Sequence, residues 1–146
     1  MVQGLSYIGC AGWSLAFAQD TAAGFFDALR ARHAAPLALE PRHASWFTPE
    51  VDGWLALRQV ARVLADPVRH DSGRAPGGFG ERVYLRLHGS PRMYCSSYDP
   101  ELLQTLARRI AAAIGEGREL WCMFDNTASA AAAHNAIALK QALQEG

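Results

Sequence analysis

The segment Val83-Tyr-Leu-Arg-Leu-His-Gly-Ser-Pro-Arg-Met-Tyr94 begins as a buried strand and ends as a turn. Its first five residues are the branched, apolar and aromatic types that fit a pleated, buried surface, and Gly-Ser-Pro cannot continue a strand or a helix. Arg86 and His88 are two residues apart, so they share one face of the strand. A guanidinium and an imidazole are costly to hide there and useful when exposed, so we expect a functional site at this strand end.

Apolar strands and helical patterns alternate along the rest of the chain. We expect strands at residues 5–14, 36–40, 60–66, 83–87 and 119–124. We expect helices at residues 22–34, 48–59, 100–114 and from about 129 to the end, the first capped by Asp20-Thr21, the second by Thr48 and the third by Asp99. Residues 67–82 hold four Gly and two Pro, which predicts an irregular surface loop. Alternation of this kind predicts an α/β fold with a parallel sheet covered by helices.

Composition narrows the function classes. The 146 residues are 50% hydrophobic, enough for one domain with a real core, and the formal net charge is zero. A nucleic-acid-binding protein would show a basic face, so nucleic acid is an unfavoured partner. Three cysteines without a CxxC pair, no secretory signal and no membrane-length apolar run predict a single-domain cytoplasmic protein. The GxGxxG and P-loop motifs of nucleotide-binding proteins are absent.

Every predicted strand ends in polar or reactive residues. The carboxyl ends of parallel strands build the functional site in α/β folds, so these residues should share one rim. They lie at residues 10–13, 40–43, 66, 86–88 and 125–126. Such a collection suits an anionic or sugar-like small ligand, or a divalent metal.

Several of these residues also have purely structural interpretations. Glu40 and Arg42 could form an ion pair, and His43 could cap a turn. Asp66 could simply begin the loop that follows it. Tryptophans pack in cores more often than they bind ligands, which applies to Trp46, Trp54 and Trp121. Cys10 lies on the rim, but no neighbouring base can be assigned to activate it as a nucleophile.

Five segments in the same order resemble the YecE-like family, whose activity is unassigned. They are IGCAGWS at 8–14, LALEPRHASWF at 37–47, VYLRLHGSPRMY at 83–94, SSYDPELL at 96–103 and MFDNT at 123–127. The resemblance covers most of the chain and implies a TIM-barrel type of fold. The rim residues that it implies are Trp13, Glu40, Arg42, His43, Trp46, Asp66, Arg86, His88, Tyr98 and Asn126, and Arg92 lies in the same motif as His88.

The sequence departs from the family pattern in three ways. Pro41 replaces the usual aromatic residue between the Glu and the Arg, and Asp125 stands where Asn is usual. A full barrel needs about 250 residues, and here a block between Ser14 and the helix near Phe25, roughly three βα units, is missing. Five parallel strands cannot close such a barrel. We expect either an open twisted sheet, two chains sharing one core as a homodimer, or a marginally stable paralogue.

The resulting hypothesis is a protein, enzyme or pseudo-enzyme, that binds or acts on a phosphorylated or sugar-like small molecule at the carboxyl rim of a partial barrel. Arg86, Arg92 and His88 would hold the anion, and Glu40 or Asp66 would be the general base. Glu40, His43, Asp66 and His88 could also bind a divalent metal between them. Two alternatives stay open: a non-catalytic interaction remnant of a barrel, and a metal-dependent phosphoesterase or nuclease-like activity.

Overall fold

The computed structural model describes the backbone of residues 8–145 and the side chains of residues 13–145. Strands and helices alternate along the chain, as the sequence predicts. The elements are β1 (Ile8–Trp13), α1 (Gln19–Arg30), β2 (Leu37–Pro41), the 3-10 turn η1 (Ala44–Trp46), α2 (Pro49–Leu57), β3 (Val60–Arg62), β4 (Leu64–Asp66), the 3-10 turn η2 (Asp71–Gly73), β5 (Gly77–Gly78), β6 (Arg82–Leu87), α3 (Pro100–Gly115), β7 (Glu119–Phe124) and α4 (Ala131–Glu145).

The main strands form two parallel sheets that share one chain segment. β1, β2 and β3 pair in that order, and β4, β6 and β7 pair in that order. The segment predicted as one strand, residues 60–66, is divided at Val63, whose N–H donates to Leu39 O at 2.8 Å. Its first half therefore extends the β2 side and its second half the β6 side. Within the described residues the parallel strands form an open arrangement with β1 and β7 at its ends. Association of two chains stays a prediction.

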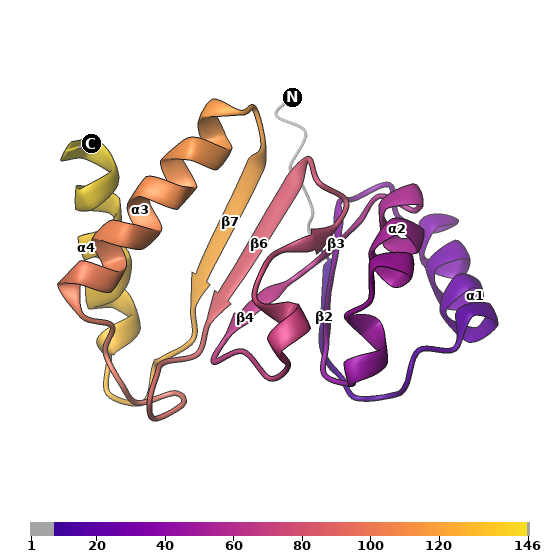
Figure 1. Ribbon diagram of the computed structural model, residues 1–146, viewed down its shortest axis with the longest axis horizontal. Coiled ribbons are helices and arrows are strands. Elements are labelled where there is room, and N and C mark those ends of the chain that lie inside the picture. The colour runs from indigo at the N-terminus through magenta and orange to yellow at the C-terminus, as the bar shows by residue number, and fades with distance from the viewer. Residues whose placement is uncertain (1–7, 146) are drawn as a thin grey trace.

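Two hydrophobic cores lie on the helix side of these strands. The first packs α1 and α2 against β2 and β3 around residues such as Phe26, Leu39 and Leu55. The second packs α3 and α4 against β6 and β7 around Leu85 and Ile110. Figure 1 shows the two helix pairs on opposite flanks of the strands. Full burial of each large apolar side chain contributes roughly 1.5–3 kcal/mol, so each helix pair holds its own half of the fold.

Helix capping agrees with the sequence for α2 and α3 but not for α1. Thr48 Oγ1 accepts from Val51 N at 3.3 Å, and Asp99 Oδ1 accepts from Leu102 N at 2.8 Å. The helix predicted at 22–34 instead spans Gln19–Arg30, and its N-cap, Ala18, makes no side-chain cap hydrogen bond. Asp20 lies inside the first turn, where its negative charge interacts favourably with the helix dipole but does not cap the helix.

The segment 67–82 is more ordered than a surface loop. Gly77 and Gly78 pair antiparallel with β3, and Asp52 on α2 accepts from Gly78 N at 3.1 Å. Asp52 also receives Arg62 through two hydrogen bonds of 2.7 and 2.9 Å. Gly78 has φ of +67°, and a Cβ there would lie 2.4 Å from Val60 O, so only glycine fits. The Gly-rich composition that predicted an irregular loop serves this close approach.

The described residues contain no helix that is both long and apolar enough to cross a membrane. Cys95 and Cys122 are free thiols. The predicted strand residues 5–7 and the side chain of Cys10 lie outside the part that the structure describes.

Candidate functional site

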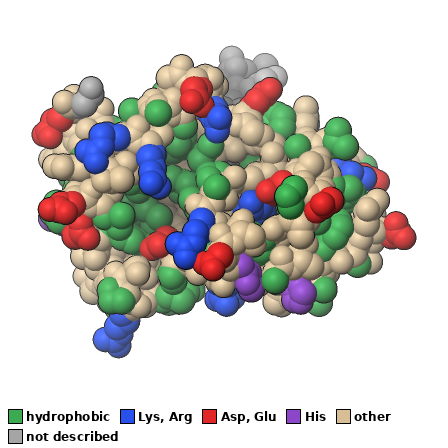
Figure 2. All heavy atoms as spheres, viewed as in Figure 1, with side chains coloured by type: hydrophobic (Ala, Val, Ile, Leu, Met, Phe, Trp, Pro, Cys, Tyr) green, Lys and Arg blue, Asp and Glu red, His purple; other side chains and the backbone are tan. Residues whose placement is uncertain are grey.

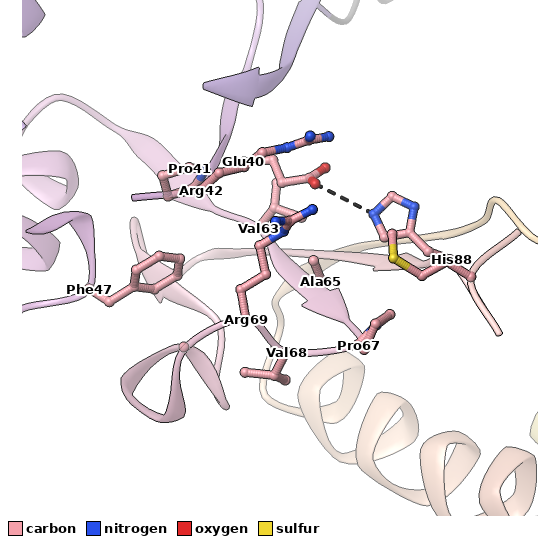
Figure 3. A pocket seen from close by; sticks show the side chains of 12 residues that line it. Glu40, Pro41, Arg42, Phe47, Val63, Ala65, Pro67, Val68, Arg69 and His88 are labelled. Carbon is pink, nitrogen blue, oxygen red and sulfur yellow. Dashed lines mark ion pairs between the residues drawn. The ribbon is translucent and has the colours of Figure 1, made fainter. Parts of the chain in front are cut away.

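A pocket of about 250 Å³ lies at the carboxyl ends of the central strands. It combines acidic, basic and imidazole groups with an apolar wall. Its lining residues are Glu40, Pro41, Arg42, Phe47, Val63, Ala65, Pro67, Val68, Arg69, Gly73, His88 and Met93. In Figure 3, Glu40 and His88 face each other across this pocket, and the side chain of Arg69 extends toward them from the segment after β4. Of the predicted rim residues, this pocket therefore brings together Glu40, Arg42 and His88.

Arg86 on β6 holds two carboxylates together beside the pocket. Its Nη1 donates to Glu40 Oε2 at 2.7 Å, and its Nε donates to Asp125 Oδ2 at 2.9 Å. Its Nη2 donates to the same oxygen of Asp125. Burial alone would lower the pKa of Arg86, but the hydrogen bonds and charges of Glu40 and then of Asp125 outweigh it and raise the pKa. Arg86 is thus a fixed cation that is already neutralised, rather than the anion ligand that the sequence predicted.

His88 lies between the same two carboxylates. Its Nε2 is 3.4 Å from Glu40 Oε1, and its Nδ1 is 3.3 Å from Asp125 Oδ2. The imidazole is buried, and Nδ1 makes no hydrogen bond of good geometry within the described residues. An imidazole next to a carboxylate is a common arrangement for general acid–base catalysis, in which a proton moves to or from a bound molecule. Arg86 and His88 therefore approach the same two carboxylates, as expected for side chains that share one face of the strand.

Arg42 and Arg69 are the cations that this pocket leaves available. Neither guanidinium forms an ion pair with another described residue, and Arg42 Nε is buried without a hydrogen-bond partner. Arg42 is anchored through its backbone, whose N–H donates to Trp13 O at 2.7 Å and whose carbonyl lies 3.1 Å from His70 Nε2. A buried guanidinium N–H without a partner is costly unless a ligand or water supplies an acceptor.

Three of the predicted rim residues belong to the first core or its edge. Trp46 is 1% exposed and donates from its indole N–H to Leu15 O at 2.8 Å. Trp13 packs edge-on against Phe25 and Trp46. His43 is exposed, and its Nδ1 accepts from Ser45 N at the start of η1. These residues hold the β2 strand end in place, and the structural interpretation of Trp46 and of His43 is the one observed.

Asp66 and Tyr98 shape the loop after β6. The Tyr98 hydroxyl donates to Asp66 Oδ2 at 2.7 Å and accepts from Gly89 N at 2.8 Å. Burial and the hydrogen bond to Asp66 raise the pKa of Tyr98 well above its ordinary range. Gly89 has φ of +95°, and a Cβ there would lie 2.9 Å from Ser96 O. The Asp66 carboxylate is thus occupied by Tyr98 and is not among the groups that line the pocket.

Asn126 is a second support of this loop. It is fully buried and donates to Ser96 O and to Asn135 Oδ1 at 2.9 and 2.8 Å. Asn135, on α4, accepts in turn from Tyr98 N at 3.2 Å. Arg92 lies exposed on the same loop and does not line the pocket. The loop motif of the sequence therefore contributes mainly architecture, with His88 and Met93 as its contacts with the pocket.

The four residues predicted to share a metal are not brought together. Glu40 and His88 meet, but His43 caps η1 and Asp66 binds Tyr98. Among the described residues no group of three or more His, Cys, Asp and Glu side chains is arranged to hold a metal ion.

Sequence reasoning missed Arg69 and Met93 as lining residues and undervalued Asp125. Arg69 follows the strand end at Asp66 by three positions, inside the segment interpreted as surface loop. Its position shortly after a predicted strand could have identified Arg69 as a candidate site residue, because the same criterion selected Glu40 and His88. The sequence places Asp125 among the polar residues at the strand ends, but its pairing with Arg86 could not be predicted from one sequence.

The fold and the pocket define an α/β protein with parallel strands and a charged cavity at their carboxyl ends. The chain belongs to the family described as "Protein of unknown function DUF72", whose model matches residues 13–146. This agrees with the YecE-like resemblance of its motifs. A comparison with curated proteins found no match.

Solved structures of the same family share the fold. A DUF72 family protein from Thermotoga maritima MSB8 is 23% identical, with a TM-score of 0.70, and the match covers 88% of this chain and 54% of that chain. A DUF72 family protein from Enterococcus faecalis V583 is 19% identical, with a TM-score of 0.71 and coverage of 94% and 60%. This chain therefore spans less than two thirds of the length of these structures.

Proposed function

We propose that the protein binds a small phosphorylated or otherwise anionic molecule, such as a sugar phosphate, in the pocket between Glu40 and Arg69. The observation that carries the proposal is that Arg42 and Arg69 both line this cavity, and that Arg42 Nε is buried without a hydrogen-bond partner among the described residues. Guanidinium groups match phosphate and carboxylate oxygens in geometry and charge. The sequence predicts Arg86 and Arg92 as the arginines that hold the anion. In this proposal Arg42 and Arg69 take that role.

The remaining pocket groups support a polar, hydroxyl-bearing ligand. The Glu40 carboxylate is buried and faces His88, so an acceptor and a proton carrier lie next to each other. Val63, Ala65 and Met93 supply apolar contact area. A volume of about 250 Å³ is at the small end of the ligand cavities of proteins, which favours a metabolite over a polymer.

Calorimetric titration with inorganic phosphate, glycerol 3-phosphate and neutral glycerol tests this proposal. We expect both phosphate compounds to bind and glycerol to bind at least tenfold more weakly. Loss of a hydrogen bond to a charged group costs about 1.5–3 kcal/mol, so Arg42→Gln and Arg69→Gln should each weaken binding roughly tenfold to a hundredfold.

Arg74→Gln is the matched control, because Arg74 lies in the same segment as Arg69 but is exposed and pairs with Asp71 at 2.7 Å. This variant should bind like the parent protein. Equal affinity in all three variants, or no binding of any phosphate compound, would refute the proposal.

We also propose that the chain is a shortened form of a barrel architecture and acts in the cytoplasm. Support for the shortening comes from the 54–60% coverage of its solved relatives and from the short connection of residues 14–18 between β1 and α1. Free thiols at Cys95 and Cys122 fit a reducing compartment. A crystal structure in which one chain closes eight strands by itself would contradict the shortened architecture, and recovery of the protein in an extracytoplasmic fraction would contradict the location.

A further inference from the structure

β7 has a strand edge that no other described strand covers. The N–H of Glu119 donates to Glu81 O, just before β6, at 2.8 Å. The N–H of Asp125, just after β7, donates to Leu87 O at the end of β6, at 2.7 Å. Successive residues of a strand direct these groups alternately to either side. The backbone groups of Leu120, Cys122 and Phe124 therefore point away from β6.

The side chains along this edge are mostly apolar and include no proline or lysine. Leu120, Cys122 and Phe124 pack toward the second core, and Met123, on the opposite face, is 45% exposed. Figure 2 shows hydrophobic side chains along β7 at the surface. Natural edge strands are usually protected by charge, proline, a bulge or a covering segment, and an unprotected apolar edge is a template for pairing with another strand.

The opposite end of the fold offers a matching edge. β1 and β7 are both six residues long, and β1 pairs on one side only, with β2, among the described strands. Every pairing from β1 to β3 and from β4 to β7 is parallel, apart from the short β5. A β1 strand added beside β7 would therefore continue the same arrangement without a change of direction.

We propose that two copies of this chain associate through these edges, with β7 of each copy pairing in parallel with β1 of the other. The contact is heterologous, and two such contacts related by a twofold axis close into a ring in which the β1 and β7 edges of both copies are covered. The occupant is a second copy because the chain itself carries both complementary edges. Its formal net charge of zero also adds no overall repulsion between copies.

Amide hydrogen exchange measured by NMR tests this pairing residue by residue. The amides of Leu120, Cys122 and Phe124 should be protected at millimolar protein and should lose protection on dilution. Those of Trp121 and Met123, which point toward β6, serve as internal controls and should stay protected throughout. Light scattering on the same samples should give twice the 15.9 kDa of one chain at high concentration.

Two variants complete the experiment. Met123→Lys places a charge at the contact on a side chain that is already 45% exposed, so it should yield a folded monomer with unprotected edge amides. Leu57→Lys makes the same kind of change at an 85% exposed position on α2 and should stay dimeric. A monomer at every concentration, or a dimer whose three edge amides exchange freely, would overturn the proposal. A Met123→Lys variant that stays dimeric while its three edge amides exchange freely would likewise overturn the β7–β1 arrangement.

Discussion

Replacing Arg86 by Met removes the cation that holds Glu40 and Asp125 together while keeping an unbranched apolar stem. Glu40 is the critical partner, because its side chain is 8% exposed and would be left buried without its counter-charge. The Asp125 side chain is 33% exposed and can turn to water. The loss therefore comes mainly from Glu40.

The magnitude follows from these exposures. Removing one partner of a buried ion pair costs about 3–5 kcal/mol, whereas an exposed pair contributes about 0–1 kcal/mol. Arg86 itself is 24% exposed, which places the expected loss near the lower bound, about 3 kcal/mol. For a chain of this length that corresponds to a fall in Tm of roughly 6–12 °C.

Urea unfolding followed by tryptophan fluorescence measures the effect. The double variant Glu40→Gln, Arg86→Met removes both charges, so we expect it to recover about 2 kcal/mol of the loss. Strictly additive effects of the two substitutions, or a loss below about 0.5 kcal/mol for Arg86→Met, would show that this ion pair does not organise the site.

Three further predictions concern the supports of the pocket. Gly78→Ala should lower the free energy of unfolding by more than about 1 kcal/mol, because Gly78 has a positive φ and a Cβ there would meet the Val60 carbonyl. Gly53→Ala, in α2 with nothing within 4 Å of the added Cβ, should raise it by about 0.5–1 kcal/mol. Midpoints of urea unfolding compare the two variants, and equal effects would contradict the backbone argument. Tyr98→Phe leaves the Asp66 carboxylate and an N–H without their partner, so unfolding free energy should fall by about 1–3 kcal/mol at neutral pH, whereas a neutral effect would mean that water replaces the hydroxyl. Burial raises the pKa of Tyr98, so its neutral form stabilises the folded state. This contribution is complete below the ordinary phenol pKa of 10.0 and is lost as the pH rises above it. The free energy of unfolding should therefore fall less steeply from about pH 9 to about pH 11 in Tyr98→Phe than in the parent protein.

Local rules predicted the parts of the fold that depend on local patterns. Alternating apolar runs located the parallel strands, and Thr48 and Asp99 cap their helices as their side chains require. α1 begins earlier than predicted because packing of its apolar face, with Ala22 and Phe26 buried, sets its start in place of a side-chain cap. The division of residues 60–66 at Val63 depends on which neighbour each half pairs with, and that information lies outside the segment.

The candidate site was predictable in its location but not in its assignments. A parallel sheet directs all strand ends to one rim, which brought Glu40, Arg86 and His88 together. Which cation pairs and which stays available depends on distances between strands, so one sequence could not distinguish Arg86 from Arg42. Long-range hydrogen bonds likewise determine that Asp66 and Tyr98 support the loop and do not enter the pocket.

NMR signals of the arginine Nε–H groups, followed during titration with inorganic phosphate, test the anion site most directly. The Nε–H of Arg42 is buried and has no acceptor in the described structure, so binding should shift its resonance and slow its exchange with water. The Arg69 signal should move with the same affinity, and that of Arg74 should not. Unchanged Arg42 and Arg69 signals at saturating phosphate would contradict the account.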